Sequence, residues 1–138
     1  MNTPTIDVET LRTWLEQRQP VTVLDVRAMQ DRAEWSIPGS LHVEANDPRA
    51  LGNVKLPDHQ PVVTVCGAGK VSITAAEQLR ARGFQTFSLA GGMKAWSLAW
   101  NQALLALPGA DVQIIQVRRT GKGCLSYLIG TKGAAAVI

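Results

Sequence analysis

A chain of 138 residues that is 46% hydrophobic and 18% charged can bury the core of one globular domain but is short for two. Its net charge of +3 is unevenly spread: residues 1–58 hold six Lys/Arg against nine Asp/Glu, and residues 59–138 hold eight against two. The basic half suits a small anionic partner, but only Arg118 and Arg119 are adjacent and no aromatic residues alternate with the basic ones, so no nucleic-acid partner is expected.

No apolar run approaches the roughly 18 residues of a membrane-spanning helix, so no membrane partner is expected. The N-terminus lacks the charged and apolar regions of a secretory signal, which favours a cytoplasmic location. In a reducing compartment Cys66 and Cys124 are expected as free thiols. His42 has no second metal-type residue at helical or strand spacing, so we interpret it as a surface or a hydrogen-bonded histidine rather than a ligand, and no metal or cofactor is expected.

The first predicted element is a helix over residues 8–18, capped by Asp7, with apolar side chains spaced for one face at Leu11, Trp14 and Leu15. Residues 21–26 then form a near-continuous apolar run, which is typical of a strand covered on both faces. Asp25 and Arg27 stand at its carboxyl end, the edge where open α/β sheets bind ligands. They belong either to a binding site or to a structural ion pair.

Shorter elements follow. They are a helix over 28–35, a turn at 37–39, a strand over 41–43 and an irregular crossover over 44–60 with one helical turn near Arg49.

The stretch from Pro61 to Ser72 carries the strongest chemical signal. β-Branched residues predict a strand that ends at Cys66, and a loop with two glycines leads to a helix that Ser72 can cap and Gly83 can stop. The loop amides, the helix N-terminus and Lys70 would surround the thiol with a positive field, which lowers its pKa from about 8.5. We predict a nucleophilic sulfur in an anion-binding nest, and the alternative is a cysteine that only packs.

Neither nucleotide-binding loop pattern fits this stretch. A phosphate-binding loop would need glycine in place of Thr64 and a hydroxyl residue in place of Val71. A dinucleotide fingerprint would need glycine in place of Ser72 and an acidic residue about twenty positions later.

The next predicted elements are a strand over 84–89 and a helix from about Met93 to Leu105, with an inward stripe at Ala95, Trp96, Ala99 and Ala103. Strand–helix alternation from residue 5 to 106 predicts an α/β fold, a parallel sheet with helices on both faces.

The pattern changes after a linker at 107–111. Three strand-like runs at 111–117, 124–129 and 134–138 are separated by turns at 120–123 and 130–133. Three strands cannot bury two faces, and an apolar edge invites association. This segment is therefore expected either to open a larger β-rich domain or to be completed by another chain, as in a homo-oligomer.

Four motifs occur in order along residues 1–106: Leu24-Asp-Val-Arg27, Glu34-x-x-Ile37-Pro-Gly39, Cys66-x-x-Gly69-x-x-Ser72 and Leu89-Ala-Gly-Gly-Met-x-Ala-Trp96. In this order and spacing they resemble the rhodanese homology domain, the thiosulfate and persulfide sulfurtransferase family. The resemblance implies a rhodanese-like sheet in which Cys66 becomes a persulfide and Asp25 and Arg27 orient its loop. The implied substrate-binding positions are Gly67, Ala68, Gly69, Lys70, Val71 and Ser72.

The loop departs from this family at Gly67 and Val71, where arginines are common, and Ser36 replaces a common histidine. Lys70 is then the loop's only side-chain cation, which favours a low-molecular-weight persulfide or protein-borne sulfur over the thiosulfate dianion. The related phosphatase branch has a loop one residue longer that ends in Arg, so Ser72 argues against phosphatase activity.

Residues 112–138 resemble the first strands of a metallo-β-lactamase-fold hydrolase, as in rhodanese fusion proteins, on the run Arg118–Gly130. The metal-binding His-x-His-x-Asp-His segment is absent from them, and Cys124 has no assigned chemistry. The two resemblances together predict a rhodanese-like domain at 1–106, a linker at 107–111 and a β-rich fragment at 112–138.

The leading hypothesis is a sulfurtransferase that moves sulfane sulfur from thiosulfate or a low-molecular-weight persulfide, through a Cys66 persulfide, to a thiol or cyanide acceptor. Its partners would be a small anionic sulfur donor and a thiol or protein acceptor. The alternative is a non-catalytic rhodanese-like module that binds or positions a sulfur-carrying partner or mediates assembly.

Overall fold

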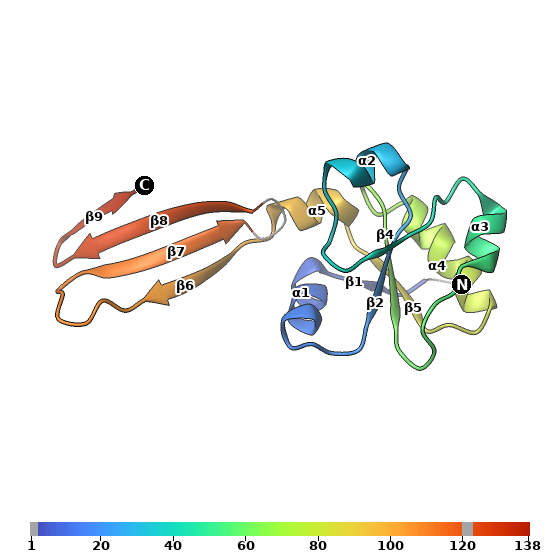
Figure 1. The fold of residues 1–138 in the computed structure, drawn as a ribbon, viewed down its shortest axis with the longest axis horizontal. Coiled ribbons are helices and arrows are strands. Elements are labelled where there is room, and N and C mark those ends of the chain that lie inside the picture. The colour runs from blue at the N-terminus through green and yellow to red at the C-terminus, as the bar shows by residue number, and fades with distance from the viewer. Residues whose placement is uncertain (1–2, 120–122) are drawn as a thin grey trace. The chain divides into compact units, whose positions relative to one another are not determined.

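The computed structural model describes residues 3–119 and 123–138. The chain divides into two compact units, Met1–Trp96 and Ser97–Ile138, each of which is described by itself (Figure 1). In the described part of the chain, no helix has the length and apolar character needed to cross a membrane.

The first unit contains one parallel sheet of five strands in the order β1-β5-β4-β2-β3 (Figure 1). The strands are β1 (Thr5–Ile6), β2 (Thr22–Asp25), β3 (Leu41–His42), β4 (Val62–Val65) and β5 (Thr86–Leu89). The strand that leads to Cys66, β4, lies at the centre, and its register against β2 runs from Thr22↔Val62 to Asp25↔Val65. The predicted parallel α/β sheet is confirmed.

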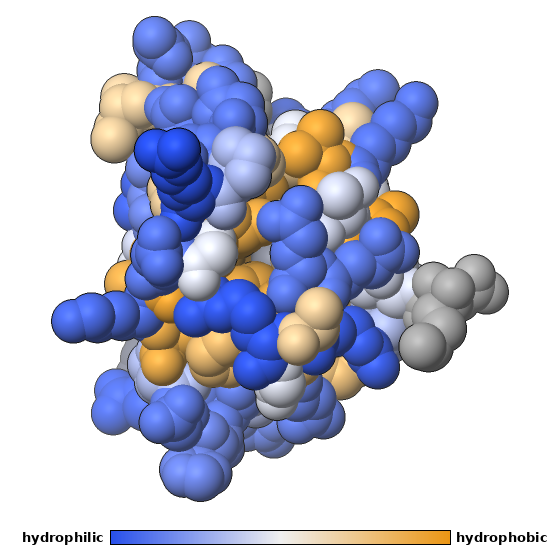
Figure 2. Space-filling view, turned by 90° about the vertical axis from the view of Figure 1, so that its right-hand side faces the viewer, coloured by the Kyte–Doolittle hydropathy of each residue, from blue (hydrophilic) through white to orange (hydrophobic). Residues whose placement is uncertain are grey.

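Helices cover both faces of this sheet, because neighbouring residues of a strand point to opposite sides. One core cluster joins Leu11 of α1 and Trp96 of α5 to Val63, and a second joins Leu51 of α3 and Leu79 of α4 to Val62. The helices are α1 (Val8–Glu16), α2 (Met29–Glu34), α3 (Pro48–Asn53), α4 (Val71–Ala81) and α5 (Gly92–Leu98). Seen from the side where α3 lies in Figure 1, the surface is mostly hydrophilic, with apolar side chains between the polar ones (Figure 2).

Most helix ends follow the sequence signals. The Asp7 side chain accepts a hydrogen bond from the Thr10 amide at 2.7 Å, which confirms it as the cap of α1. Gly83 follows α4 with a φ of +95°, as expected of a stop. The predicted cap at Ser72 is wrong: α4 begins at Val71 after Lys70, and Ser72 lies inside the first turn. Its hydroxyl instead contacts Cys66, because the first turn packs directly behind the loop.

The second unit is an antiparallel sheet with the order β6-β7-β8-β9. Its strands are β6 (Asn101–Leu105), β7 (Gln113–Arg119), β8 (Cys124–Thr131) and β9 (Ala134–Val137). The three predicted strands are confirmed, and the turn before β9 is Lys132–Gly133. The other predicted turn falls mostly on residues 120–122, which lie outside the described residues.

The predicted helix over 93–105 is wrong in its second half. Helix α5 ends at Leu98, and residues 101–105 form β6, in which Ala103 pairs with Gln116 of β7. The apolar residues there fit a helix or a strand equally well, and hydrogen bonding to β7 decides between them. The second compact unit, Ser97–Ile138, therefore includes residues 101–105.

Candidate active site

Cys66 lies at the carboxyl end of β4 and is only 5% exposed. Its neighbours Val62–Val65 are buried in the sheet, so the position of the thiol follows from the central strand rather than from a mobile surface loop. The segment 66–70 leads into α4, and the hydroxyl of Ser72, in the first turn of this helix, lies next to the sulfur. This is the edge where parallel sheets bind ligands.

Several donors converge on the sulfur. The Gly69 amide donates to Sγ at 3.2 Å, and the Ser72 hydroxyl lies 3.3 Å from it. Burial alone raises the pKa of the Cys66 thiol, but hydrogen bonds from the Ser72 hydroxyl and from the amides of Ser72, Gly69 and Ala68 outweigh it, so the pKa is lowered from its ordinary value. The arrangement therefore stabilises a thiolate.

Behind the sulfur lies a buried network of hydroxyl groups. Ser72 Oγ is 2.8 Å from Ser88 Oγ of β5, and Thr64 of β4 donates to the Ser72 carbonyl at 2.7 Å. All three residues are fully buried. Ser88 was not predicted from the sequence, because a serine in an apolar strand carries no local sign that it faces a residue sixteen positions away.

The N-terminal turn of α5 supports the loop from the other side. The amide of Met93 donates to the Cys66 carbonyl at 2.8 Å, and the amide of Lys94 donates to the Gly67 carbonyl at 2.9 Å. Gly92, with a φ of +55°, touches the loop so closely that a Cβ there would overlap the Cys66 carbonyl oxygen. The Gly-Gly pair after β5 is thus explained by close approach of two backbones.

Asp25 and Arg27 form a buried ion pair at the end of β2. Arg27 Nη2 lies 2.7 Å from Asp25 Oδ2, and the Arg27 amide and Nε also donate to the carboxylate. The same guanidinium donates to the carbonyls of Asp31 and Trp35, so it anchors α2 and the segment after it. The structural ion pair is therefore present, and a role in orienting the Cys66 loop stays a prediction.

The imidazole of His42 is hydrogen-bonded, as predicted. Its Nε2 lies 2.7 Å from the Arg27 carbonyl oxygen, which can only accept, so this nitrogen carries the proton. Among the residues that the structure describes, no group of three or more His, Cys, Asp or Glu is placed to hold a metal ion.

A pocket of about 270 Å³ opens beside Cys66. Its lining comes from the ends of β2 and β4 and from the segments that follow them: Val26, Arg27, Ala28, Asp31, Glu44, Ala45, Asn46, Cys66, Gly67 and Val71. Asp31 and Glu44 are the acidic residues of this lining. The Glu44 carboxylate accepts a hydrogen bond from the Met29 amide at 2.8 Å, and the Arg27 guanidinium is already paired with Asp25. A larger hollow of about 770 Å³ in the second unit has no cysteine or histidine in its lining and is not a candidate site.

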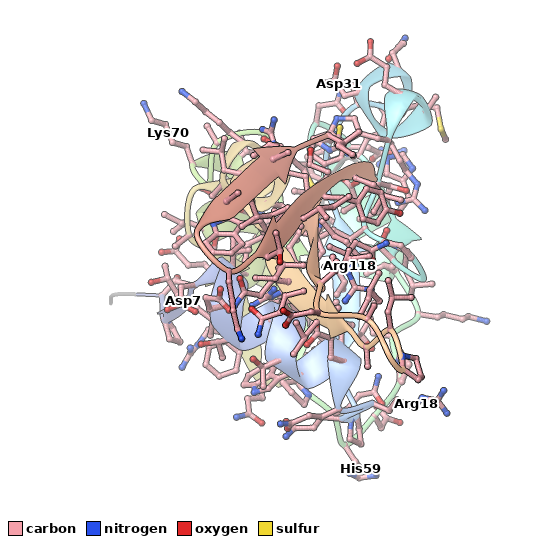
Figure 3. The ribbon with its side chains drawn as sticks, turned by 90° about the vertical axis from the view of Figure 1, so that its left-hand side faces the viewer. Asp7, Arg18, Asp31, His59, Lys70 and Arg118 are labelled. Carbon is pink, nitrogen blue, oxygen red and sulfur yellow. The ribbon has the colours of Figure 1, made fainter. Side chains whose placement is uncertain are left out.

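The predicted substrate-binding residues divide into two groups. The amides of Ala68, Gly69 and Ser72 are directed at the sulfur, as described above. Gly67, Lys70 and Val71 are exposed, and the Lys70 side chain extends outwards from the molecule (Figure 3). Gly67 and Val71 line the pocket, and the roles of all six residues with substrate stay predictions. Cys124 is exposed on β8.

Comparisons with known proteins agree with this fold. The sequence profile of the Rhodanese-like domain family matches residues 7–99. The putative sulfurtransferase YtwF of Bacillus subtilis (strain 168) is 29% identical over 92 residues, which are 66% of this chain and 87% of that protein. A tRNA sulfurtransferase of Desulfurococcus amylolyticus is 35% identical over 71 residues, which are 51% of this chain but only 14% of that protein.

Solved structures show the same likeness. The rhodanese-like domain protein from Staphylococcus aureus has a TM-score of 0.61 and 27% identity, covering 68% of this chain and 91% of that one. The rhodanese homolog TT1651 from Thermus thermophilus has a TM-score of 0.54 and 30% identity, covering 67% of this chain and 100% of that one. With its fold, its cysteine loop and the family profile in agreement, the chain belongs to the rhodanese-like domain family.

Proposed function

We propose that this protein is a cytoplasmic sulfurtransferase that carries sulfane sulfur as a persulfide on Cys66. The observation that carries the proposal is the convergence of the Gly69 amide and the Ser72 hydroxyl on a sulfur whose pKa is lowered despite its burial. A thiol with a lowered pKa is present as the thiolate in a larger fraction at neutral pH, and the thiolate is the nucleophilic form. The sulfurtransferase names of two relatives support the same class of reaction.

The reaction needs two displacements and no net oxidation. The Cys66 thiolate attacks the outer sulfur of a donor persulfide, a new S–S bond forms, and the donor leaves as a thiolate. The outer sulfur of the enzyme persulfide is then attacked by a thiolate or cyanide acceptor, and Cys66 leaves with the bonding electron pair. The loop amides stabilise the sulfur anion in both steps, and ping-pong kinetics follow from the covalent intermediate.

The charges around the pocket bear on the donor. Asp31 and Glu44 line it, and the Arg27 guanidinium is neutralised by Asp25, while Lys70 extends away from the molecule. Carboxylates repel a dianion more strongly than they repel a donor without net charge. We therefore propose that a low-molecular-weight persulfide without net negative charge is a better donor than thiosulfate.

The test of the function is sulfur loading followed by intact mass measurement. The full chain is incubated with thiosulfate or with glutathione persulfide, alongside Cys66→Ala and, as a matched control, Cys124→Ala. The expected result is a gain of one sulfur atom in the wild type and in Cys124→Ala and no gain in Cys66→Ala. A gain that persists without Cys66, or no gain from either donor, would falsify the proposal.

The non-catalytic alternative makes a different prediction about the same sulfur. An inert module would keep the Cys66 pKa near its ordinary value, whereas the hydrogen bonds to Sγ favour a lowered one.

For residues 112–138 we propose the opening strands of a metallo-β-lactamase-fold domain. Support comes from the sequence resemblance and from the antiparallel sheet β7-β8-β9.

A further inference from the structure

We infer that Ser88 is a positioning residue that acts on Cys66 through Ser72, by directing the one hydroxyl proton of Ser72 to the sulfur. The inference rests on the proposed function, in which Cys66 must be a thiolate before the first displacement and becomes one again when it leaves in the second. Ser88 belongs to β5, outside the cysteine loop and outside the motifs that mark it in the sequence.

The geometry is a line of three groups. Cys66 Sγ lies 3.3 Å from Ser72 Oγ, and Ser72 Oγ lies 2.8 Å from Ser88 Oγ. Ser72 and Ser88 are both 0% exposed. Their hydroxyls are therefore shielded from bulk water, and each proton position is decided by the neighbouring groups.

The number of protons available for donation determines the direction of the hydrogen bonds along this line. A hydroxyl has one proton to donate and two lone pairs that accept. When Cys66 is a thiolate it can only accept, so Ser72 uses its proton on the sulfur and its oxygen is left to accept from Ser88. A chain of hydrogen bonds that all point one way strengthens each member, and the terminal bond to the thiolate gains most from it.

The line can also reverse. When Cys66 carries a proton, the S–H group donates to Ser72, and Ser72 donates to Ser88. Ser88 thus accepts from Ser72 in one state of the cysteine and donates to it in the other. A side chain that could only donate or only accept would exclude one of the two states, whereas a second serine allows both. The hydrogen-bond chain that ends on the charged sulfur is the stronger of the two, so Ser88 favours the thiolate.

The test is the pH profile of Cys66 alkylation by iodoacetamide in four forms of the full chain: wild type, Ser72→Ala, Ser88→Ala and the double variant. A Cys124→Ala background removes the exposed thiol. Loss of Ser88 raises the Cys66 pKa, and a raised pKa leaves less thiolate at any pH below it. The expected result for Ser88→Ala is an alkylation rate about two- to tenfold lower at a pH well below the pKa, with an unchanged plateau at high pH.

The double variant shows whether Ser88 acts through Ser72. Adding Ser88→Ala to Ser72→Ala is expected to cause no further change in the profile. The inference is overturned by a Ser88→Ala profile that superimposes on the wild type, or by a further loss in the double variant.

Thr86→Val is the matched control. Thr86 lies two residues earlier on the same strand and the same face, is equally buried, and donates to the Ala76 carbonyl at 2.8 Å. Loss of this hydroxyl is expected to lower the free energy of unfolding and to leave the pH profile of Cys66 alkylation unchanged.

The experiment also separates this inference from the proposed function, because alkylation needs no sulfur donor. If the wild type fails to load sulfur but Ser88→Ala still changes the alkylation profile, only the proposed function is refuted.

Discussion

At the scale of single residues, the state of one sulfur atom depends on two opposing effects. Burial of Cys66 opposes its charge, and hydrogen bonds from Ser72, Gly69 and Ala68 favour it and prevail. The only basic side chain of the loop, Lys70, extends outwards, so the field at the sulfur comes from neutral dipoles close by rather than from a full charge. Backbone dipoles are held in place by the fold and need no reorganisation when the sulfur becomes charged.

The pocket charges lead to a prediction about donor choice. The double variant Asp31→Asn, Glu44→Gln is expected to raise kcat/KM for thiosulfate, relative to that for cysteamine persulfide, about three- to tenfold. Removing two carboxylates relieves repulsion of the thiosulfate dianion but barely affects a donor whose ammonium and persulfide charges cancel. A glutamine in place of Glu44 can still accept the hydrogen bond that the Met29 amide donates to this position, so α2 should keep its place. Steady-state kinetics with both donors measure the ratio.

The control for this comparison is Asp58→Asn. Asp58 precedes β4, whereas Cys66 follows it, so the two lie at opposite ends of the strand. An equal rise of the ratio in Asp58→Asn, or no rise in the double variant, would show that Asp31 and Glu44 do not select the donor.

At the scale of elements, the site is made where three of them meet: β4 carries Cys66, α4 brings Ser72 to it, and α5 holds the loop by two amides. The sequence signal for the last contact is the glycine pair after β5, which is readable as a turn. Only the tertiary structure shows why glycines are needed there: they allow α5 to pack closely against the carbonyls of Cys66 and Gly67.

Gly92→Ala should therefore affect both stability and the thiol. The added Cβ requires a strained backbone and overlaps the Cys66 carbonyl, and we expect a loss of about 2–4 kcal/mol in the free energy of unfolding together with a raised Cys66 pKa. Urea unfolding and the alkylation profile measure the two effects. Gly83→Ala serves as the control, because φ is also positive there but no atom lies within 4 Å of the new Cβ. Gly83→Ala should lower the free energy of unfolding by about 1 kcal/mol and leave the Cys66 pKa unchanged. An equal change of the Cys66 pKa in both variants would refute the argument.

At the scale of the whole molecule, the two units differ in how they are stabilised. The first has two clusters of buried apolar side chains, one on each face of its sheet. Of the side chains described in the second unit none is buried, and large apolar residues such as Leu125 and Val137 are exposed. A single-layer sheet with open edges gains little from burial until something covers it.

We accordingly expect the full chain to self-associate through the second unit and a chain that ends at Leu98 to be monomeric, with the same Cys66 pKa. The shortened chain ends at Leu98, before β6, because β6 belongs to the second sheet and would be left without its partner strand β7 in a chain that ended at the linker. Sedimentation velocity over a range of concentrations measures the association. A monomeric full chain whose β7 and β8 amides exchange slowly with solvent would contradict the expectation, since the sheet would then be stable alone.

Local patterns in the sequence determined the parallel sheet, a buried strand with Cys66 at its end, and the loop amides around the sulfur, because strand periodicity and turn chemistry act over a few neighbouring residues. The tertiary structure decided what lies far apart in the chain. It brings Ser88 to Ser72, anchors α2 through Arg27, docks α5 on the loop and pairs residues 101–105 with β7. In each case hydrogen-bond partners from distant segments select among local conformations that the sequence alone leaves nearly equal in energy.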